Sequence, residues 1–256
     1  MQRFEGRAVF VTGVASGIGR ASFVQFASEG ASVYGIDANA EALAETEQMA
    51  EAAVAEAGGS GATLIVQPGD VSDEQAVGAH VAAAVDAFGG LDVVANIAGI
   101  LRFGHTHEFD FATWRKMFDV NVHGTFLVCR AALPHLLERR GVIVNIASTA
   151  AHAGCPWGAA YSGTKGAVLS MTRALAVEYA EQGLRAVTIS PGSVETPIQN
   201  EFAVPEGANW KLIQRAMPLG RSAKPEELGK IVAWAASDDS SIFNGADLRI
   251  DSATLA

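Results

Sequence analysis

Short runs of apolar residues alternate with alanine-rich stretches along almost the whole chain. The apolar runs lack a strict alternation of apolar and polar positions, which is typical of strands buried on both faces. We expect strands at 7–12, 31–36, 63–66, 91–95, 142–146 and 186–189, and helices at 21–29, 40–57, 73–88, 113–139 and 160–182. Because strands and helices alternate, the pattern predicts an α/β fold with a doubly wound parallel sheet and helices on both faces.

The size and composition of the chain fit a single domain. Its 256 residues, of which 49% are hydrophobic, can bury a substantial core, and no proline- or serine-rich linker divides them. We therefore expect residues 1–256 to form one domain. No apolar run reaches the ~18 residues of a membrane span, and the first strand begins too early to leave room for a signal peptide.

Charge and cysteine content narrow the expected partners and compartment. The formal net charge of −10 argues against nucleic acid as a partner, and against an acidic acyl carrier protein as a substrate. The two cysteines, Cys129 and Cys155, fit a reducing compartment without a disulfide framework. We expect a cytoplasmic protein that acts on a small molecule and has no membrane partner.

A glycine-rich turn follows the first apolar run and leads into a helical stretch. Gly13, Gly17 and Gly19 have the spacing Gly-x-x-x-Gly-x-Gly. In a strand–turn–helix context, such glycines allow the backbone to approach a pyrophosphate, and the helix offers it free N–H groups. The turn therefore predicts a dinucleotide site, with a glycine-rich turn that binds no ligand as the alternative.

An acidic residue ends the second predicted strand. Asp37 lies eighteen residues after Gly19, the distance at which a carboxylate can accept hydrogen bonds from an adenosine ribose. Its charge would repel the 2′-phosphate of NADP. Ser16 and Ala38 occupy the two positions where a phosphate-binding cation could lie, so the sequence favours NAD over NADP. The alternative is an ordinary turn aspartate.

A tyrosine and a lysine four residues apart carry the candidate chemistry. Tyr161 and Lys165 lie on one face of a predicted helix, and Ser148 stands thirteen residues before the tyrosine. A phenol has an ordinary pKa of about 10, which a nearby ammonium lowers. The pair is therefore a candidate general acid and base for an alcohol oxygen, although a Tyr-x-x-x-Lys pattern by itself is common.

Together these motifs resemble the short-chain dehydrogenase/reductase family, and the resemblance covers about Gly6 to Asp251. It implies a Rossmann-like sheet of about seven strands and catalysis by Asn121, Ser148, Tyr161 and Lys165. It also implies cofactor contacts from the glycine turn, the second to fourth strand ends, the catalytic helix and the segment after the sixth strand. The implied contacts are Gly13, Ser16, Gly17, Ile18, Gly19, Asp37, Asp70, Val71, Asn96, Ala98, Gly99, Tyr161, Lys165, Pro191, Gly192, Val194 and Thr196.

Two positions depart from the pattern of the family. Ile97 replaces the second asparagine of an Asn-Asn-Ala-Gly segment, so a hydrogen bond that braces the sheet is expected to be missing. Asp251-Ser252-Ala253 replaces the common Asp-Gly-Gly, which puts the docking of the C-terminal segment in doubt. The resemblance further implies a homo-oligomer, a dimer or tetramer, that associates through the helices at 113–139 and 160–182.

The resemblance implies an NAD-dependent oxidoreductase that interconverts a secondary alcohol and a ketone. We expect residues 197–218 to form a lid over a medium-sized, partly hydrophobic or cyclic substrate. The apolar residues expected around it are Leu101, Trp157, Ile198, Phe202, Val204, Trp210, Leu212, Ile213 and Met217. The alternatives are a 3-oxoacyl thioester reductase and a non-catalytic dinucleotide-binding sensor or scaffold.

Three histidines near the expected site raise further questions. His105 and His107 could chelate a metal only in an extended segment, and no third ligand is evident, so we expect no metal site. His152 lies between Ser148 and Tyr161 and could contact a polar group of the substrate, with exposure in a loop as the alternative.

Overall fold

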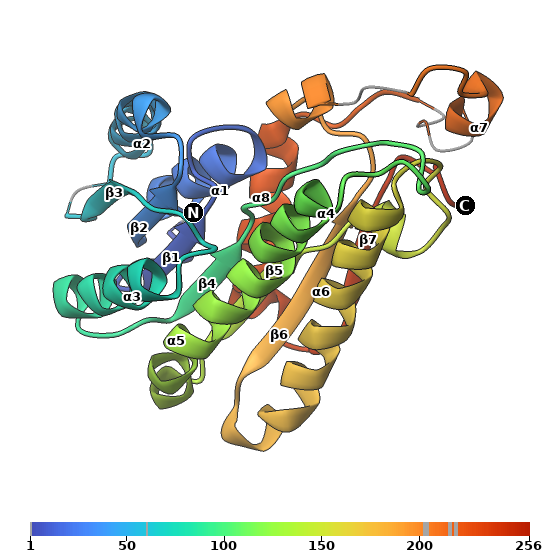
Figure 1. Ribbon diagram of the computed structural model, residues 1–256. Coiled ribbons are helices and arrows are strands. Elements are labelled where there is room, and N and C mark those ends of the chain that lie inside the picture. The colour runs from blue at the N-terminus through green and yellow to red at the C-terminus, as the bar shows by residue number, and fades with distance from the viewer. Residues whose placement is uncertain (1, 60, 202–204, 215–216, 218–219) are drawn as a thin grey trace.

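Seven parallel strands form one sheet in the order β3-β2-β1-β4-β5-β6-β7 in the described part of this computed structural model (Figure 1). All residues are described except 1, 60, 202–204, 215–216 and 218–219. The strands are β1 Ala8–Thr12, β2 Ser32–Asp37, β3 Leu64–Pro68, β4 Val93–Asn96, β5 Val142–Ile146, β6 Arg185–Pro191 and β7 Asp247–Ile250. The predicted α/β fold with a doubly wound, Rossmann-like sheet of seven strands is confirmed.

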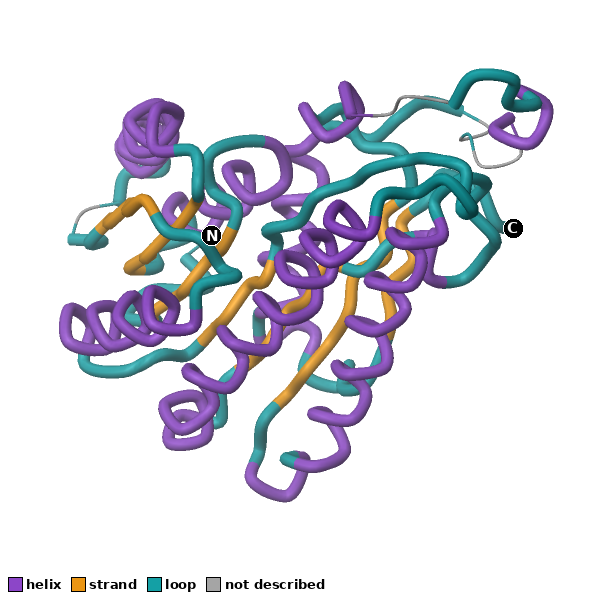
Figure 2. Tube along the Cα trace, in the orientation of Figure 1, coloured by secondary structure: helices purple, strands orange, loops and turns teal. Residues whose placement is uncertain are grey.

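Helices cover both faces of the sheet, as Figure 2 shows. They are α1 Gly17–Ser28, α2 Leu43–Glu56, α3 Glu74–Phe88, α4 Phe111–Phe118, α5 Thr125–Arg139, α6 Ala159–Glu178, α7 Trp210–Gln214 and α8 Pro225–Ala236. The short α7 and the helix α8 lie outside the ranges that the apolar pattern predicted. Among the described residues, no helix combines the length and the apolar character that crossing a membrane requires.

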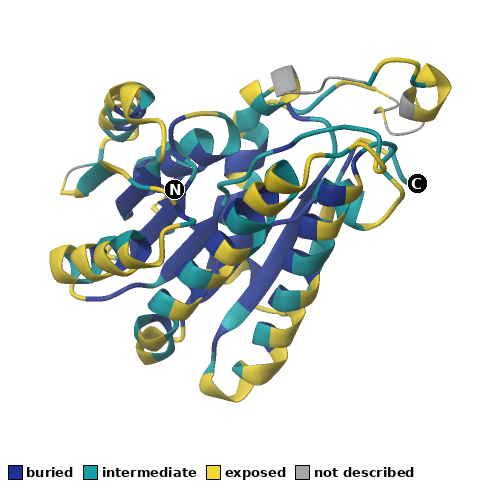
Figure 3. Ribbon diagram, in the orientation of Figure 1, coloured by how far each residue is buried: buried dark blue, intermediate teal, exposed yellow. Residues whose placement is uncertain are grey.

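Two hydrophobic cores form because successive strand residues face opposite sides of the sheet. On β1, Val9 and Val11 pack into the core beneath α1, α2 and α8, whereas Ala8 and Phe10 pack into the core beneath α3 and α5. All of these side chains are buried, and Figure 3 shows the central strands as a continuous buried layer. Burial on both faces explains why the apolar runs lack polar positions.

The helix expected at 113–139 is interrupted. A π-helical turn, Asp119–Gly124, separates α4 from α5 and contains Asn121. π-turns add one residue to a helical turn and are frequent at functional sites. Asn121 bonds to Ile100 just after β4, and the strand order reverses between β1 and β4, the kind of point at which α/β sheets bind ligands.

Candidate active site

The glycine turn between β1 and α1 forms a cradle for an anion. Gly13 has a positive φ of 79°, and a Cβ at Gly19 would lie 1.9 Å from the carbonyl oxygen of Gly13, so only glycine fits there. Ser16 precedes α1, and its side chain makes no capping hydrogen bond to the first N–H groups of the helix. These features fit a dinucleotide pyrophosphate.

Asp37 lies at the end of β2, beside the glycine turn. Its carboxylate accepts hydrogen bonds from the backbone N–H groups of Ala15, at 2.9 Å, and Asn39, at 2.8 Å. The neighbouring cation, Arg20, pairs with Glu45 at 2.7 Å and also donates to the carbonyl oxygen of Ala15. Since this guanidinium is already paired, it adds no free positive charge for a 2′-phosphate.

A cavity of about 420 Å³ lies beside the glycine turn. Among the residues expected to bind the cofactor, its walls contain Gly13, Ser16, Gly17, Ile18, Gly19, Asp37, Asp70, Val71, Ala98, Gly99 and Thr196. Lys116 of α4 also lines it, and its Nζ lies 3.3 Å from Asp70. The sequence reasoning missed Lys116, because no motif marks a lysine that reaches the cavity from a helix 46 residues further along the chain.

Burial, Ser72 and Lys116 together set the pKa of the Asp70 carboxyl. Partial burial acts to raise the pKa of this carboxyl. Hydrogen bonds from the hydroxyl and N–H groups of Ser72, together with the positive charge of Lys116, outweigh burial and lower the pKa below its ordinary value. Asp70 therefore stays ionised at neutral pH and can accept hydrogen bonds from a ligand in the cavity.

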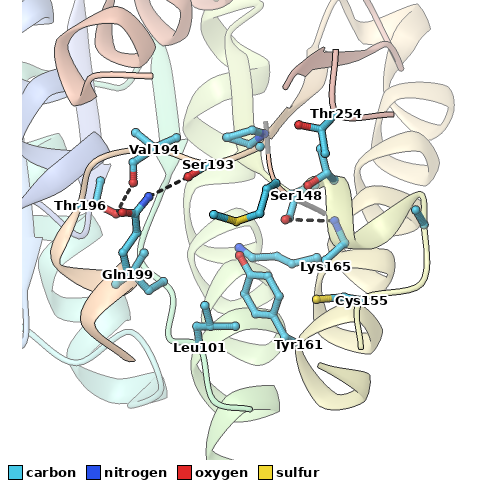
Figure 4. Close-up of a pocket in the computed structure, with 18 of the residues that line it drawn as sticks. Leu101, Ser148, Cys155, Tyr161, Lys165, Ser193, Val194, Thr196, Gln199 and Thr254 are labelled. Carbon is cyan, nitrogen blue, oxygen red and sulfur yellow. Dashed lines mark hydrogen bonds between the residues drawn. The ribbon is translucent and has the colours of Figure 1, made fainter. Parts of the chain in front are cut away.

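Three of the expected catalytic residues gather at the carboxyl end of β5. Ser148 follows the strand, and Tyr161 and Lys165 lie one turn apart on α6 (Figure 4). The Nζ atom of Lys165 donates to the carbonyl oxygen of Ile146 at 2.8 Å and lies 5.8 Å from the centroid of the Tyr161 ring. Figure 4 shows the hydroxyl of Tyr161 beside the Lys165 amine, with Ser148 next to them.

Burial is the largest influence on the pKa values of Tyr161 and Lys165. It raises the pKa of Tyr161 to about 12, although a hydrogen bond with Ser148 acts in the opposite direction. Burial also lowers the pKa of Lys165 to about 8. Both side chains are therefore shifted towards their neutral forms. The sequence predicts that Lys165 lowers the pKa of Tyr161; in the protein alone this prediction is wrong, because burial raises that pKa.

Asn121 lies behind the catalytic helix, in the π-helical turn. Its amide accepts a hydrogen bond from the N–H of Ile100 at 2.8 Å and donates to the carbonyl oxygen of Ile100 and to the hydroxyl of Thr164. A Cβ at Gly99 would lie 3.3 Å from the Oδ1 of Asn121 and 3.5 Å from the Nζ of Lys165. Asn121 thus joins the end of β4 to the catalytic helix.

A second cavity, of about 880 Å³, contains the catalytic side chains. Its walls include the expected residues Gly99, Leu101, Ser148, Tyr161, Lys165, Pro191, Gly192, Val194, Thr196, Ile198, Trp210, Leu212 and Met217. Phe103, Cys155, Gln199, Thr254 and Leu255 also line it and were not expected. Trp157 is absent from these walls. Phe202 and Val204 lie outside the described residues, as does the side chain of Ile213.

The histidines near this cavity have partners in the protein. The Nε2 atom of His105 donates to the carbonyl oxygen of Glu206 at 3.2 Å, and the His105 ring packs edge-on against Trp157. His107 is exposed and pairs with Glu108. His152 contacts Asp247, is only partly exposed and is not among the residues that line the larger cavity, so neither a substrate contact nor free exposure in a loop describes it in this arrangement.

Comparison with known proteins places this geometry in a family. The sequence profile of a family described as "Enoyl-(Acyl carrier protein) reductase" matches residues 13–252. The chain is 37% identical to 3beta-hydroxysteroid dehydrogenase 1 of Eggerthella lenta over 96% of this chain and 93% of that protein. It is 36% identical to meso-2,3-butanediol dehydrogenase of Serratia marcescens over 99% and 96% of the two chains.

A solved structure agrees with these sequence matches. The crystal structure of levodione reductase superposes with a TM-score of 0.90 at 32% identity, and the match covers 99% of this chain and 100% of that one. The chain belongs to the short-chain dehydrogenase/reductase family. It is therefore an oxidoreductase that acts on alcohols and ketones with a nicotinamide dinucleotide.

The bracing hydrogen bond that the family forms at the position of Ile97 is replaced here by other buried side chains. Asn96 was expected to contact the cofactor, but its side chain lines neither cavity. It is buried and donates to Asn145 Oδ1 at 2.9 Å and to Cys129 Sγ at 3.3 Å. Asn145 in turn donates to Thr172 on α6 at 2.8 Å. This chain of hydrogen bonds braces β4, β5 and α6, so replacing the second asparagine by Ile97 does not leave the central sheet without a side-chain brace.

The second departure alters the wall of the larger cavity. Ser252 and Ala253, where short-chain dehydrogenases/reductases commonly have two glycines, adopt positive φ angles of 49° and 62°. This conformation costs a residue with a Cβ roughly 1–2 kcal/mol. The turn is held by Asp251, whose carboxylate accepts from the N–H of Leu255 at 3.1 Å. It directs Thr254 and Leu255 to the cavity wall despite the missing glycines.

Proposed function

We propose that the protein is an NAD-dependent dehydrogenase that oxidises a secondary alcohol to a ketone, with Tyr161 as the general base. The observation that carries this proposal is the junction of the two cavities. The cavity beside the glycine turn and the cavity that contains Tyr161 share Gly99 and Thr196 in their walls. A dinucleotide that is held by the glycine turn can therefore extend towards the phenol.

In the proposed reaction the phenolate form of Tyr161 removes the proton from the substrate hydroxyl, and Ser148 donates a hydrogen bond that orients the substrate oxygen. Bound NAD supplies the hydride acceptor and a positively charged ring near the phenol. Lys165 in its neutral amine form would accept that proton from the Tyr161 phenol, which restores the phenolate, and it would also hold the nicotinamide ribose. Asn121 keeps the catalytic helix in register with β4 through Ile100 and Thr164, and supports a water-linked path for the proton from Lys165.

We propose NAD as the preferred dinucleotide because of the charges around the adenosine end of the smaller cavity. Asp37 lines that cavity, and its carboxylate repels a 2′-phosphate while it accepts hydrogen bonds from a ribose diol. Ser16 and Ala38 carry no charge, and Arg20 is paired with Glu45. We also propose that the other residues implied as cofactor contacts by the resemblance touch the bound NAD. Asn96 is the exception, because its side chain pairs with Asn145.

The proposed substrate is a medium-sized secondary alcohol that is partly hydrophobic or cyclic. The larger cavity of about 880 Å³ is in the range of sites for drug-sized ligands, and a bound nicotinamide would occupy part of it. Leu101, Phe103, Ile198, Leu212 and Met217 give the walls an apolar character. The relative from Eggerthella lenta, which by its name acts on a hydroxysteroid, supports a cyclic substrate. We propose that residues 197–218 act as the lid over this site.

Initial rates with NAD and with NADP test the proposal across secondary alcohols, sugars, hydroxysteroids and 3-hydroxyacyl thioesters. We expect turnover with NAD and with one apolar structural class. A higher kcat/KM with NADP and 3-hydroxyacyl thioesters, the reverse of the reductase reaction, would instead favour the alternative 3-oxoacyl thioester reductase. Tight NAD binding without turnover on any alcohol would support a non-catalytic sensor or scaffold.

We also propose that the protein is a cytoplasmic homo-oligomer, a dimer or tetramer, formed through α5 and α6. Large apolar side chains support this: Phe126 on α5 is 46% exposed, and Val177 on α6 is 81% exposed. Contiguous apolar patches mark interfaces between proteins, and these two side chains would contribute to one. Light scattering during gel filtration measures the mass, and a monomer at micromolar concentration would contradict the proposal.

A further inference from the structure

A cluster of polar side chains lies behind Ser148, outside the reaction described above. The Nε2 atom of His152 lies 2.9 Å from Asp247 Oδ2 on β7 and 3.2 Å from the hydroxyl oxygen of Ser190 on β6. The Ser190 hydroxyl donates to the other oxygen of Asp247 at 2.6 Å. The side chain of Asp247 is only 8% exposed, so both oxygens of a buried carboxylate have partners in the cluster.

His152 belongs to the same turn as Ser148. The turn is a 3₁₀ helix in which the N–H of Ala150 donates to the Ser148 hydroxyl at 3.2 Å and the N–H of Ala151 to the Ser148 carbonyl at 2.9 Å. The N–H of His152 closes the turn on the carbonyl oxygen of Thr149 at 3.0 Å. Because these bonds link successive residues, a displacement of His152 is transmitted to Ser148.

The two ends of this turn are attached to the sheet in different ways. The end before Ser148 continues from β5, where Ala147 donates to Ile189 of β6 at 2.8 Å. The other end is attached through the His152 side chain to Ser190 and Asp247. Ser190 directly precedes Pro191, which lines the larger cavity, so the cluster joins the Ser148 turn to that wall.

We propose that His152 is a positioning residue that fixes the Ser148 hydroxyl relative to Tyr161 by anchoring the turn to Asp247 and Ser190. This inference rests on the proposed function, in which Ser148 orients the substrate oxygen. His152 itself does not touch the reacting atoms. Misplacement of a reacting or orienting group by about 1 Å can lower a rate about 100-fold.

The test compares H152A, H152Q and wild type on the panel alcohol with the highest wild-type kcat/KM. Glutamine keeps an N–H donor at a reach similar to that of Nε2, whereas alanine leaves the Asp247 oxygen without its partner. We expect H152A to lower kcat about 10- to 100-fold, with NADH affinity, measured by fluorescence, essentially unchanged. H152Q should recover most of the lost kcat.

A remote ion pair of similar burial provides the control. Arg3 pairs with Glu29 at 2.6 Å, and the side chain of Glu29 is 9% exposed. R3A should lower the thermal midpoint, as H152A does, but leave kcat unchanged. If R3A and H152A reduced kcat equally at a temperature well below both midpoints, His152 would be only a stabilising residue and the inference would be wrong.

The S148A background gives the decisive comparison. If His152 acts through Ser148, adding H152A to S148A should lower kcat little further, since the positioned hydroxyl is already absent. An equal fold-loss in both backgrounds would overturn the inference, as would full kcat in H152A. Absence of wild-type turnover across the panel would refute the proposed function instead, so the two failures are distinguishable.

Discussion

The buried amide pair between β4 and β5 gives a prediction with a calculable magnitude. Asn145→Leu keeps the approximate volume of the side chain but removes the oxygen that accepts from Asn96 at 2.9 Å. The Asn96 amide would then retain only the sulfur of Cys129 at 3.3 Å, and its own Oδ1 has no partner among the described residues. Thr172 would lose a donor but still donate to the carbonyl oxygen of Val168.

The expected cost follows from leaving a buried amide without its acceptor. Such a group costs about 1–3 kcal/mol, so we expect N145L to lower the free energy of unfolding by about 2 kcal/mol. For a chain of this size that corresponds to roughly 4–8 °C in the thermal midpoint. N96L should cost a similar amount, because it leaves the Asn145 oxygen unpaired. The double variant replaces both partners by apolar groups and should recover to within about 1 kcal/mol of wild type.

Urea unfolding at one fixed protein concentration measures the three variants, and NADH fluorescence measures cofactor binding. Additive losses in the double variant would refute the reasoning, because they would mean that the two amides do not depend on each other. Binding provides an independent check. If N96L abolished NADH binding while N145L did not, Asn96 would be a cofactor ligand, as the sequence predicted, and not a brace of the sheet.

Three further predictions concern the reaction and the cofactor. Tyr161→Phe should keep NADH affinity and lower kcat about 10²–10⁴-fold, measured by the absorbance of the NADH formed. Substantial residual turnover would argue against Tyr161 as the general base. Because the folded pKa of Lys165, about 8, lies below its ordinary 10.5, the unfolded chain binds more protons between these values, and Lys165 makes the unfolding free energy rise with pH there. We expect K165M to flatten that rise between about pH 8 and 10, measured by urea unfolding at a series of pH values. At higher pH, from about 10 to 12, the raised pKa of Tyr161 makes the unfolding free energy fall with pH instead. Exchanging Asp37 for Ser and Ala38 for Arg should raise kcat/KM for NADP relative to NAD at least ~10-fold in initial-rate assays, and an unchanged ratio would remove Asp37 as the basis of the preference.

The features that the sequence determined by itself are local or repeated. The alternation of apolar runs and alanine-rich stretches predicted a parallel sheet, because strands buried on both faces leave no polar positions. The glycine turn was readable because its requirements concern a few consecutive residues, as the close approach of Gly19 to Gly13 shows. Tyr161 and Lys165 could be paired because helical periodicity alone brings residues four apart onto one face.

Other features depended on contacts between distant segments. Whether Asn96 faces a cofactor or Asn145 is decided by the packing of β4 against β5, which lie 49 residues apart. His152 finds Asp247 95 residues further along the chain, and no local pattern marks that partner. Asn121, in the π-helical turn, likewise finds its partners Ile100 and Thr164 in other segments of the chain.

The sequence therefore determined the fold class and the chemical groups, and tertiary structure decided where those groups point and how they ionise. Local periodicity sets which residues share a face, but the partner across that face comes from another element. The same holds for Tyr161 and Lys165: their spacing brings them together, whereas burial by the surrounding elements raises one pKa and lowers the other. Desolvation is a property of the packed interior, and no short stretch of sequence contains it.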